Sequence, residues 1–473
     1  MENNNLKLKF KILIACLFLL LGFFGFAEIS LAADYYVSPT GSALWSGCLN
    51  INTPCSWQTA MANAVAGDTV YFRGGNYEPG EANQFGDPKI RPVHNGAAGN
   101  PIILKAYPGE MAVIYDALRT GVASPANNTG TAAGCYQNSY ITWDGFTFNR
   151  ANNNGYQASA IMRFELSDHC SVINSDFIGR PQLDQYNGAF IHIIQSRYIY
   201  ISNNKLHGMS CGLTPSSQCV NATAVWSFNY DNVYINNNDI YDNNNALSSK
   251  IGTSYFYIYN NHIWNSPRAV INYIPQVEGT TDAFIYQNVI RNSGPALYSP
   301  DAFRPFYNLK FYNNSIFSQS ASALATIDNG TYINSRNAEV FNNIISVGGF
   351  TSIFERYGDG VDKPAYADYN DFYGTGDWRV AYSATYNTLA GWQGAIGLDL
   401  NSITSNPLFV NAGGIAPEDY KLQAGSPARI GRGGSYASVM GAYITGNEII
   451  GYTPPVLAPD ITPPAVPTGL MVQ

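Results

Sequence analysis

Lys250 is the residue whose type and setting most directly suggest chemistry. It ends a short stretch of alternating residues, so we expect it on a strand with its side chain directed outward. A neutral lysine can take a proton from a substrate, and burial or a neighbouring cation favours the neutral form. Arg268 is the nearby cation, and Tyr273, expected about 5 Å away on the adjacent strand, could protonate a leaving oxygen. These three residues form the predicted catalytic group.

Flat aromatic side chains are expected beside Lys250 on the same outward face. Trp226, Phe228 and Tyr298 fall at outward places of neighbouring strands, where their rings could stack on sugar rings. Two alternatives stay open: loops could cover these aromatic residues, and Lys250 could be a solvated surface lysine.

Three aspartates lie close in sequence to the Lys250 strand. Asp231, Asp239 and Asp242 could bind Ca²⁺ through their carboxylate oxygens. A bound cation could neutralise an acidic group of a substrate and stabilise charge that develops during proton removal. The spacing of the aspartates matches no defined calcium loop, so the sequence allows this cofactor without specifying its geometry.

Other chemistries find less support. A glycosidase would need two carboxylates at a fixed separation, and a serine hydrolase a Gly-x-Ser-x-Gly turn that the sequence lacks. His192 is expected to point inward as a core residue, and the histidines show no metal-ligand spacing. The net charge of −8, with no Lys/Arg cluster beyond the extreme N-terminus, argues against nucleic acid as a partner.

A sequence repeat indicates the secondary-structure elements that must position these residues. An Asn-rich phrase, usually Asn-Asn-x-Ile, recurs at intervals from 23 residues (240 to 263) to 34 residues (206 to 240). Each phrase follows an alternating strand, so the interval fits one turn of a β-solenoid. Stacked asparagines could form an amide ladder at the bend, where Asn also tolerates a left-handed backbone. The phrases end at Leu206, Ile240, Ile263, Ile290 and Ile316, with a variant at Phe177.

A second ladder of strands is expected after the phrases, each beginning at an alanine. We align Ala189, Ala224, Ala246, Ala269 and Ala296, and expect the apolar residue that follows each of them to point inward. The residues two and four places after each alanine should then point outward. They include Ile191 and Ile193, Trp226 and Phe228, Ser248 and Lys250, and Ile271 and Tyr273.

Both ends of a solenoid must be closed, because an open end would present unpaired strand edges. The helical spacing of Trp57–Ala66 predicts a helix that covers the first coil. Asn401–Ile430 and Gly441–Tyr443 are predicted to form the final coils.

The N-terminus is typical of an export signal. Lysines precede an apolar run that ends before Ser30-Leu-Ala32, so residues 1–32 are predicted to be a signal peptide rather than a membrane anchor. Residues 33–451 then form the β-helix domain, and residues 452–473 a Pro-rich linker. The mature chain is expected outside the cell, without a membrane span and as a monomer.

Six cysteines remain after removal of the signal, in a compartment where disulfides persist. The predicted pairs are Cys48 with Cys55, Cys211 with Cys219, and Cys135 with Cys170, and buried free thiols are the alternative.

Several stretches resemble a known superfamily. Tyr35–Pro39, Ala66–Tyr77 and Asn100–Glu110 resemble the N-terminal coils of bacterial right-handed parallel β-helix proteins, and Asn406–Phe409 and Tyr420–Pro427 resemble their C-terminal coils. Together with the repeats, these stretches cover most of the mature chain. The resemblance implies an all-β, right-handed parallel β-helix with a short N-terminal capping helix, similar to pectate lyases and alginate lyases. Residues 460–470 resemble the opening of a fibronectin type III domain, which implies that the chain continues beyond Gln473.

Leu247–Ile251 resembles the catalytic-lysine coil of the alginate lyase and chondroitinase B family, in which an arginine of the next coil assists the lysine base. Lys250 fits the lysine position. The next strand places Tyr273 where that family has arginine, and Arg268 stands at the beginning of that strand. The resemblance therefore implies the base but not its usual partner.

The predicted function is that of a secreted polysaccharide lyase that cleaves a uronic-acid polymer by β-elimination. Two alternatives remain. The chain could be a non-catalytic module for glycan binding or adhesion, or a uronan C5-epimerase. In each case the partner is an acidic or neutral polysaccharide.

Overall fold

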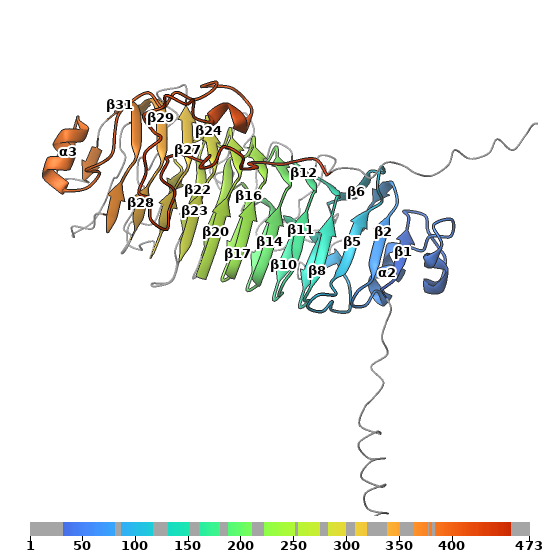
Figure 1. Cartoon of the computed structure of the whole chain (residues 1–473). Helices are drawn as coiled ribbons and strands as arrows, with labels where there is room; N and C mark the ends of the chain where they lie inside the picture. The colour runs from blue at the N-terminus through green and yellow to red at the C-terminus, as the bar shows by residue number, and fades with distance from the viewer. Residues whose placement is uncertain are drawn as a thin grey trace, which may run out of the picture.

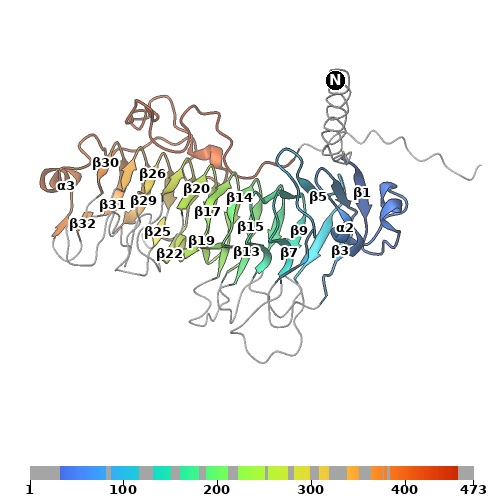
Figure 2. The ribbon, with the colours of Figure 1, turned by 90° about the horizontal axis from the view of Figure 1, so that it is seen from below.

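The chain folds into a right-handed parallel β-helix with three parallel sheets, two of which run from its first coils to its last (Figure 1). The computed structural model describes residues 32–80, 87–116, 131–150, 160–179, 188–210, 222–250, 254–274, 282–298, 308–318, 338–350, 364–376, 378–380 and 384–455. The predicted signal peptide, except Ala32, and the fibronectin-like stretch lie outside these ranges. Successive coils lie side by side along the axis (Figure 2). The predicted fold class is confirmed.

Successive coils add strands to these sheets, and among the described residues the third sheet extends only from β4 to β25. The twelve strands of sheet A are β1 (Asp34–Val37), β2 (Thr69–Phe72), β5 (Ile102–Ala106), β8 (Ile141–Asp144), β11 (Ser171–Ile173), β14 (Arg197–Ser202), β17 (Asp231–Asn236), β20 (Ser254–Tyr259), β23 (Ala283–Tyr286), β26 (Lys310–Tyr312), β28 (Glu339–Phe341) and β30 (Tyr366–Asp368). The eleven strands of sheet B are β3 (Gly75–Tyr77), β6 (Ala112–Tyr115), β9 (Thr147–Asn149), β12 (Asp176–Ile178), β15 (Lys205–His207), β18 (Asp239–Tyr241), β21 (His262–Trp264), β24 (Val289–Arg291), β27 (Ser315–Ser318), β29 (Ile344–Phe350) and β31 (Asp371–Gly376). The eight strands of sheet C are β4 (Pro88–Ile90), β7 (Thr131–Tyr136), β10 (Ala160–Glu165), β13 (Ala189–Ile194), β16 (Thr223–Phe228), β19 (Asn245–Lys250), β22 (Ala269–Ile274) and β25 (Leu297–Tyr298).

The Asn-rich phrases mark the turn from sheet A to sheet B, as predicted. Their terminal residues pair in register through β15, β18, β21, β24 and β27, from Leu206 with Ile240 to Ile290 with Ile316. The first residue of most phrases has a left-handed backbone conformation, with φ of 54° at Asn203 and 55° at Asn237. Asparagine adopts this conformation at lower cost than most residues.

The second residue of each phrase forms a buried amide ladder. Asn261 Nδ2 donates to Asn288 Oδ1 at 3.0 Å, and Asn288 Nδ2 donates to Asn314 Oδ1 at 2.9 Å. The same side chains also bond backbone groups of the turn, so each amide is fully used. The ladder comprises Asn204, Asn238, Asn261, Asn288, Asn314, Asn343 and Asn370.

Both ends of the helix are closed. Helix α2 (Trp57–Asn63) begins at Ser56, whose side chain caps Thr59 N, and it buries Ala60 and Met61 against the first coil. This confirms the predicted capping helix. At the other end, the hairpin of β32 (Trp378–Val380) and β33 (Ala384–Tyr386) leads into α3 (Leu389–Ile396), whose Trp392 is buried. Short 3₁₀ turns, η1 (Trp45–Leu49) and η3 (Pro417–Tyr420), complete the elements.

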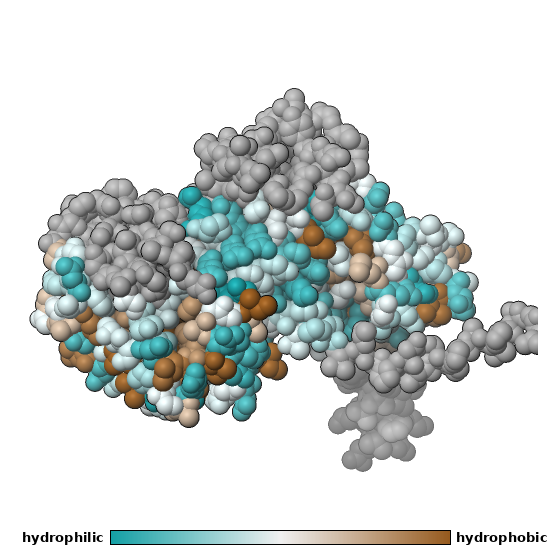
Figure 3. Space-filling view, turned by 90° about the horizontal axis from the view of Figure 1, so that it is seen from above, coloured by the Kyte–Doolittle hydropathy of each residue, from teal (hydrophilic) through white to brown (hydrophobic). Residues whose placement is uncertain are grey.

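Only the start of the predicted final coils continues the β-helix: Ile403 pairs in parallel with Asp371, and its N–H donates to Asn370 O. After α3 the chain turns back and runs outside the A-to-B turn toward the N-terminal end, seen as the red segment in Figure 1. Gly441 N donates to Asn342 O, Asn237 Nδ2 to Ile449 O and Asn203 Nδ2 to Thr453 O. Outward asparagines of the phrases thus supply the hydrogen bonds that a further coil would have supplied. Viewed from above, hydrophilic residues dominate a band across the middle of the described surface (Figure 3).

The cysteines divide into two groups. Cys48 and Cys55 form the predicted disulfide. Cys135 and Cys170 are both buried free thiols, which is the alternative kept open for them, and burial raises the pKa of the Cys135 thiol. Cys211 and Cys219 lie outside the described residues. Within the described ranges, no helix is long and apolar enough to cross a membrane.

A buried acid near the C-terminal end predicts a pH-dependent stability. Asp371 is 0% exposed and accepts only Ser405 N, at 3.1 Å, among the described residues; burial raises its pKa to about 8. An unfolded aspartate has a pKa of about 3.9, so between about pH 4 and pH 8 the folded state holds more protons. The free energy of unfolding should therefore fall as the pH rises through this window.

We expect Asp371→Asn to remove this dependence, and the difference from the parent should reach several kcal/mol, at most about 5, above pH 8. Melting temperatures of the two proteins from pH 4 to pH 9 would show it. Asp34→Asn, at an exposed acid of β1, is the control that should leave the slope unchanged. Parallel curves for Asp371→Asn and the parent would refute the assignment.

Candidate functional site

The strands of sheet C do not alternate from their first residue. Ala189 pairs with Thr223, Thr223 with Asn245, and Asn245 with Ala269. The second and third residues of each strand are both buried in the core, as Ala246 and Leu247 are. The ladder of alanines is therefore out of register by one residue, because Ala189 and Ala269 are the first residues of their strands, whereas Ala224 and Ala246 are the second.

Two outward rows follow from this register. We call the first the covered row, formed by Arg163, His192, Trp226, Ser248, Asn272 and Tyr298. We call the second the edge row, formed by Glu165, Ile194, Phe228 and Lys250.

The register keeps some predicted site residues together. Trp226 and Phe228 lie on the outward face, with rings stacked at 5.3 Å, and Lys250 pairs directly with Phe228. Tyr298 pairs with Asn272 and so lies in the covered row, although its side chain lies outside the described part. Trp226 is 1% exposed, whereas Phe228 and Lys250 are half-buried. Trp226 is therefore covered, which is one of the alternatives that the sequence left open for these aromatic residues.

Other predicted positions are corrected. Tyr273 pairs with Ser249, whose hydroxyl meets Tyr230 OH in the interior at 2.8 Å, so Tyr273 is not the neighbour of Lys250 in its row. Ile191, Ile193 and Ile271 are core residues rather than outward ones. His192, expected inward, lies in the covered row with its ring edge-on to Trp226 at 6.1 Å.

Arg268 is remote from Lys250. Since Asn245 pairs with Ala269, Arg268 stands level with Asn244, at the opposite end of β19 from Lys250. Six residues of extended strand span about 20 Å. Arg268 therefore cannot favour the neutral form of Lys250 by direct contact, and the predicted pair is wrong.

Three polar atoms of the covered row lack hydrogen-bond partners within the described structure. They are Trp226 Nε1, Ser248 Oγ and Asn272 Oδ1, from three successive coils, and each residue is at most 2% exposed. An unmade hydrogen bond at a buried group costs about 1–3 kcal/mol, so such groups call for an explanation. Sequence analysis placed Ser248 outward but missed Asn272, because the alanine ladder put Ile271 in its place.

The same face becomes basic toward the N-terminal coils. Lys89 and Arg91 flank the buried Ile90 of β4, and Arg163 follows two coils later. Glu165 lies 2.7 Å from Arg163; burial raises its pKa, and the guanidinium opposes that shift.

Asp87 approaches Arg91 at 3.7 Å. With Lys250, the described cations of this face outnumber its acids, although the whole chain carries a net charge of −8.

The three aspartates predicted to bind Ca²⁺ do not converge. Asp231 begins β17 in sheet A, whereas Asp239 begins β18 and Asp242 follows β18 in sheet B. Asp239 Oδ1 accepts Tyr452 N, and Asp242 Oδ1 accepts Asn265 Nδ2. Across the described ranges, no three His, Cys, Asp or Glu side chains gather closely enough to hold a metal ion. These residues do not fit a single calcium site.

No family model matches the chain. Over 85 residues the chain is 42% identical to pectate lyase PEL9 of Emericella nidulans, a match that covers 18% of this chain and 18% of that protein. Among solved structures, it is similar to pectate lyase Pel9A at 16% identity, with a TM-score of 0.41 and coverage of 88% of this chain and 97% of that chain. It is also similar to PfbA, a surface adhesin of Streptococcus pneumoniae, at 13% identity, with a TM-score of 0.40 and coverage of 67% and 81%.

Proposed function

We propose that the chain is an exported polysaccharide lyase that acts on a uronic-acid polymer, with the outward face of sheet C as its substrate surface. One observation carries the proposal. Lys250 stands at the half-buried edge row beside a covered row whose Trp226, Ser248 and Asn272 present buried polar atoms without partners. A ligand that reaches these atoms would find their hydrogen-bonding capacity unused in the described structure. The local identity to a pectate lyase adds support.

Lys250 is the proposed base. Its neutral amine takes the proton on the sugar carbon beside the carboxylate, and the electrons of that bond form a double bond with the neighbouring carbon. The glycosidic oxygen leaves from that carbon and takes a proton from water, since Tyr273 is not beside Lys250 in its row. The product carries an unsaturated uronate at its new end, and Lys250 returns its proton to solvent.

An acidic substrate is complementary to the positive charge of this face. Lys89, Arg91 and Arg163 continue the face away from Lys250, so an anionic polymer that follows the helix axis meets cations. No step is assigned to Ca²⁺, because the predicted aspartates do not form a donor set. Comparing reactions with and without a chelator tests whether a cation bridges the substrate and the protein.

A non-catalytic glycan-binding module is the second candidate. The observation in its favour is the distance of Arg268 from Lys250, which leaves the predicted base without its expected partner. A C5-epimerase would begin with the same proton removal but return a proton to the sugar without breaking the chain.

The experiment is to incubate the purified chain with pectate, alginate and chondroitin, with and without Ca²⁺, and to follow the ultraviolet absorbance of unsaturated uronate ends. Rising absorbance with one polymer is expected. Binding without any rise would favour the module.

Ser248 and Asn272 provide a prediction for substrate binding. We expect Ser248→Ala and Asn272→Leu each to raise KM by about fivefold with a smaller change in kcat, because each removes a hydrogen-bonding group worth about 1 kcal/mol beside the base. Initial rates over a range of polymer concentrations measure both constants. Ser171→Ala, on the outer side of sheet A, is the matched control. Unchanged KM in both variants would remove the covered row from the site.

A further inference from the structure

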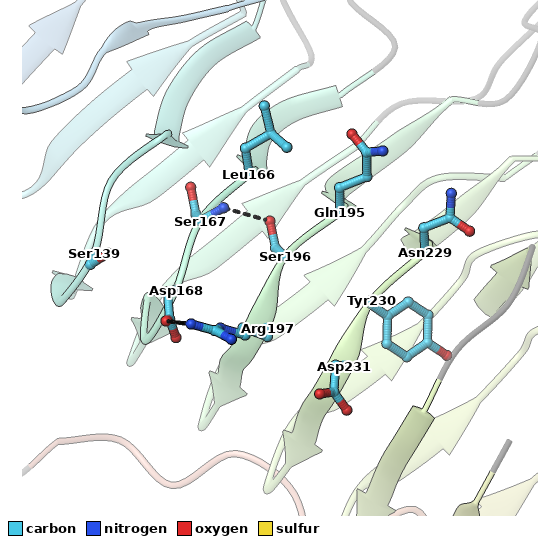
Figure 4. Close-up of a pocket in the computed structure, with 10 residues that line it drawn as sticks. All are labelled: Ser139, Leu166, Ser167, Asp168, Gln195, Ser196, Arg197, Asn229, Tyr230 and Asp231. Carbon is cyan, nitrogen blue, oxygen red and sulfur yellow. Dashed lines mark hydrogen bonds and ion pairs between the residues drawn. The ribbon is translucent and has the colours of Figure 1, made fainter. Parts of the chain in front are cut away.

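A polar groove crosses the turns between sheet C and sheet A. It is shallow and open to solvent, with a volume of about 660 Å³. Three successive turns build it, each three residues long, as Figure 4 shows. It begins at the end of the sheet C strands and lies N-terminal to the Lys250 coil.

The groove has two ridges and a floor. The first residues of the turns, Leu166, Gln195 and Asn229, are exposed and form one ridge. The third residues, Asp168, Arg197 and Asp231, form the other ridge. The middle residues form the buried floor, where Ser167 N donates to Ser196 Oγ at 3.1 Å. Because equivalent residues of adjacent coils repeat every 4.8 Å or so, the groove runs along the helix axis and suits a linear ligand.

The backbone of the groove is already used. Leu166 N donates to Ile194 O, Gln195 N to Phe228 O and Arg197 N to Ser167 O, each at 3.0 Å. An extended peptide therefore cannot add as a strand here, since strand addition needs free backbone groups. Side-chain amides, hydroxyls and carboxylates remain, and these are the groups that bond sugar hydroxyls.

The charges favour a neutral ligand. Arg197 Nε and Nη2 lie 2.9 and 2.8 Å from Asp168 Oδ2, so the positive charge of the guanidinium is balanced by the Asp168 carboxylate within the same ridge. Asp231, which is half-buried, then leaves an excess negative charge, and its buried Oδ1 has no hydrogen-bond partner in the described structure. An acidic polymer would be repelled, whereas a neutral hydroxyl can donate to Asp231. Leu166, 46% exposed, adds an apolar contact for the C–H face of a sugar.

We infer that this groove is a binding site for a neutral, linear oligosaccharide, separate from the lyase chemistry proposed for Lys250. A chain with both sites would hold a mixed polysaccharide by its neutral segments while the basic face of sheet C engages its acidic ones.

Affinity gel electrophoresis of the full chain tests this inference, with soluble galactan, xylan, glucomannan or polygalacturonate in the gel. The variant is Gln195→Gly with Asn229→Gly, because glycine accepts their left-handed φ of 48° and 45°. Asn232→Gly, at φ 54° outside the groove, is the matched control. Lys250→Ala separates this site from the lyase site.

At least one neutral polymer should retard the parent, the control and Lys250→Ala equally. The double variant should lose about tenfold or more in affinity, as expected for two lost hydrogen bonds. If the double variant melts below the parent, Asp231→Ala gives the second measurement and should also weaken binding. Retardation by polygalacturonate alone, by no polymer, or equally in all groove variants overturns the inference.

Discussion

Lys250→Ala is expected to lower kcat on the uronate polymer by about 10²–10⁴-fold, the usual contribution of a positioned general base. Proton removal beside a carboxylate has no substitute base next to Lys250 among the described residues of the edge row, where Phe228 and Ile194 separate it from Glu165. KM should change less, because the amine acts on the reacting carbon. Initial rates of ultraviolet absorbance increase provide both constants.

Two controls separate a base from a mere positive charge. Lys250→Arg keeps the charge but cannot become neutral, so it should be as inactive as the alanine variant. Lys205→Ala changes an outward lysine of sheet B and should retain full activity. Full activity of Lys250→Ala would leave the lyase reaction in place but remove Lys250 from it. Activity restored by Lys250→Arg would show that charge alone is needed.

Asn288→Asp is expected to destabilise the fold by about 3 kcal/mol or more at neutral pH. The buried amide donates to Ile258 O, Tyr286 O and Asn314 Oδ1, at 2.9, 3.1 and 2.9 Å. A carboxylate cannot donate these bonds, and its charge would stand unpaired among carbonyl oxygens. Urea unfolding midpoints and melting temperatures measure the loss.

The neighbouring residue supplies the matched control. Gln287→Asn changes a left-handed residue, at φ 54°, to one that tolerates this conformation and leaves the ladder intact. It should melt within error of the parent. The Asn288→Asp variant should recover part of its stability as the pH falls from neutral to about 4, because burial raises the pKa of the new carboxyl and its protonated form can donate one bond. Equal melting temperatures for both variants would contradict the role assigned to the ladder.

The A-to-B turn could be predicted in detail because one chemical requirement repeats in every coil. Each turn needs a left-handed residue followed by a buried amide, and asparagine satisfies both needs. The phrase therefore fixed which residues stack, from Leu206 with Ile240 onward. The cap at Trp57 followed from helical spacing alone.

The site was harder to place because sheet C has no such marker. In the sheet C strands from β7 to β22 the second and third residues both face the core, so a count of two and four places from an alanine fails where that alanine is the first residue of its strand, as Ala189 and Ala269 are. Counting places from the alanine correctly predicted that Lys250 and Trp226 lie on the outward face, and their strands begin at Asn245 and Thr223. It failed for Tyr273 and His192. The pairing of Asn245 with Ala269, which moves Arg268 away from Lys250, depends on contacts between coils that periodicity does not specify.

The return segment was unforeseen for a related reason. Its partners are outward asparagines such as Asn203 and Asn237, which a periodic reading assigns only to their own turns. Contacts at a sequence separation of 250 residues, as between Asn203 and Thr453, leave no local pattern.

Mass spectrometry of the products tests the lyase assignment most directly. The chain is incubated with pectate, alginate and chondroitin, and the masses of the released oligosaccharides are compared with those expected for hydrolysis. β-Elimination at Lys250 predicts, from one of these polymers, products one water lighter than the hydrolysis products, and none from Lys250→Ala. Polymers recovered intact, or products of hydrolytic mass, would contradict the proposed function.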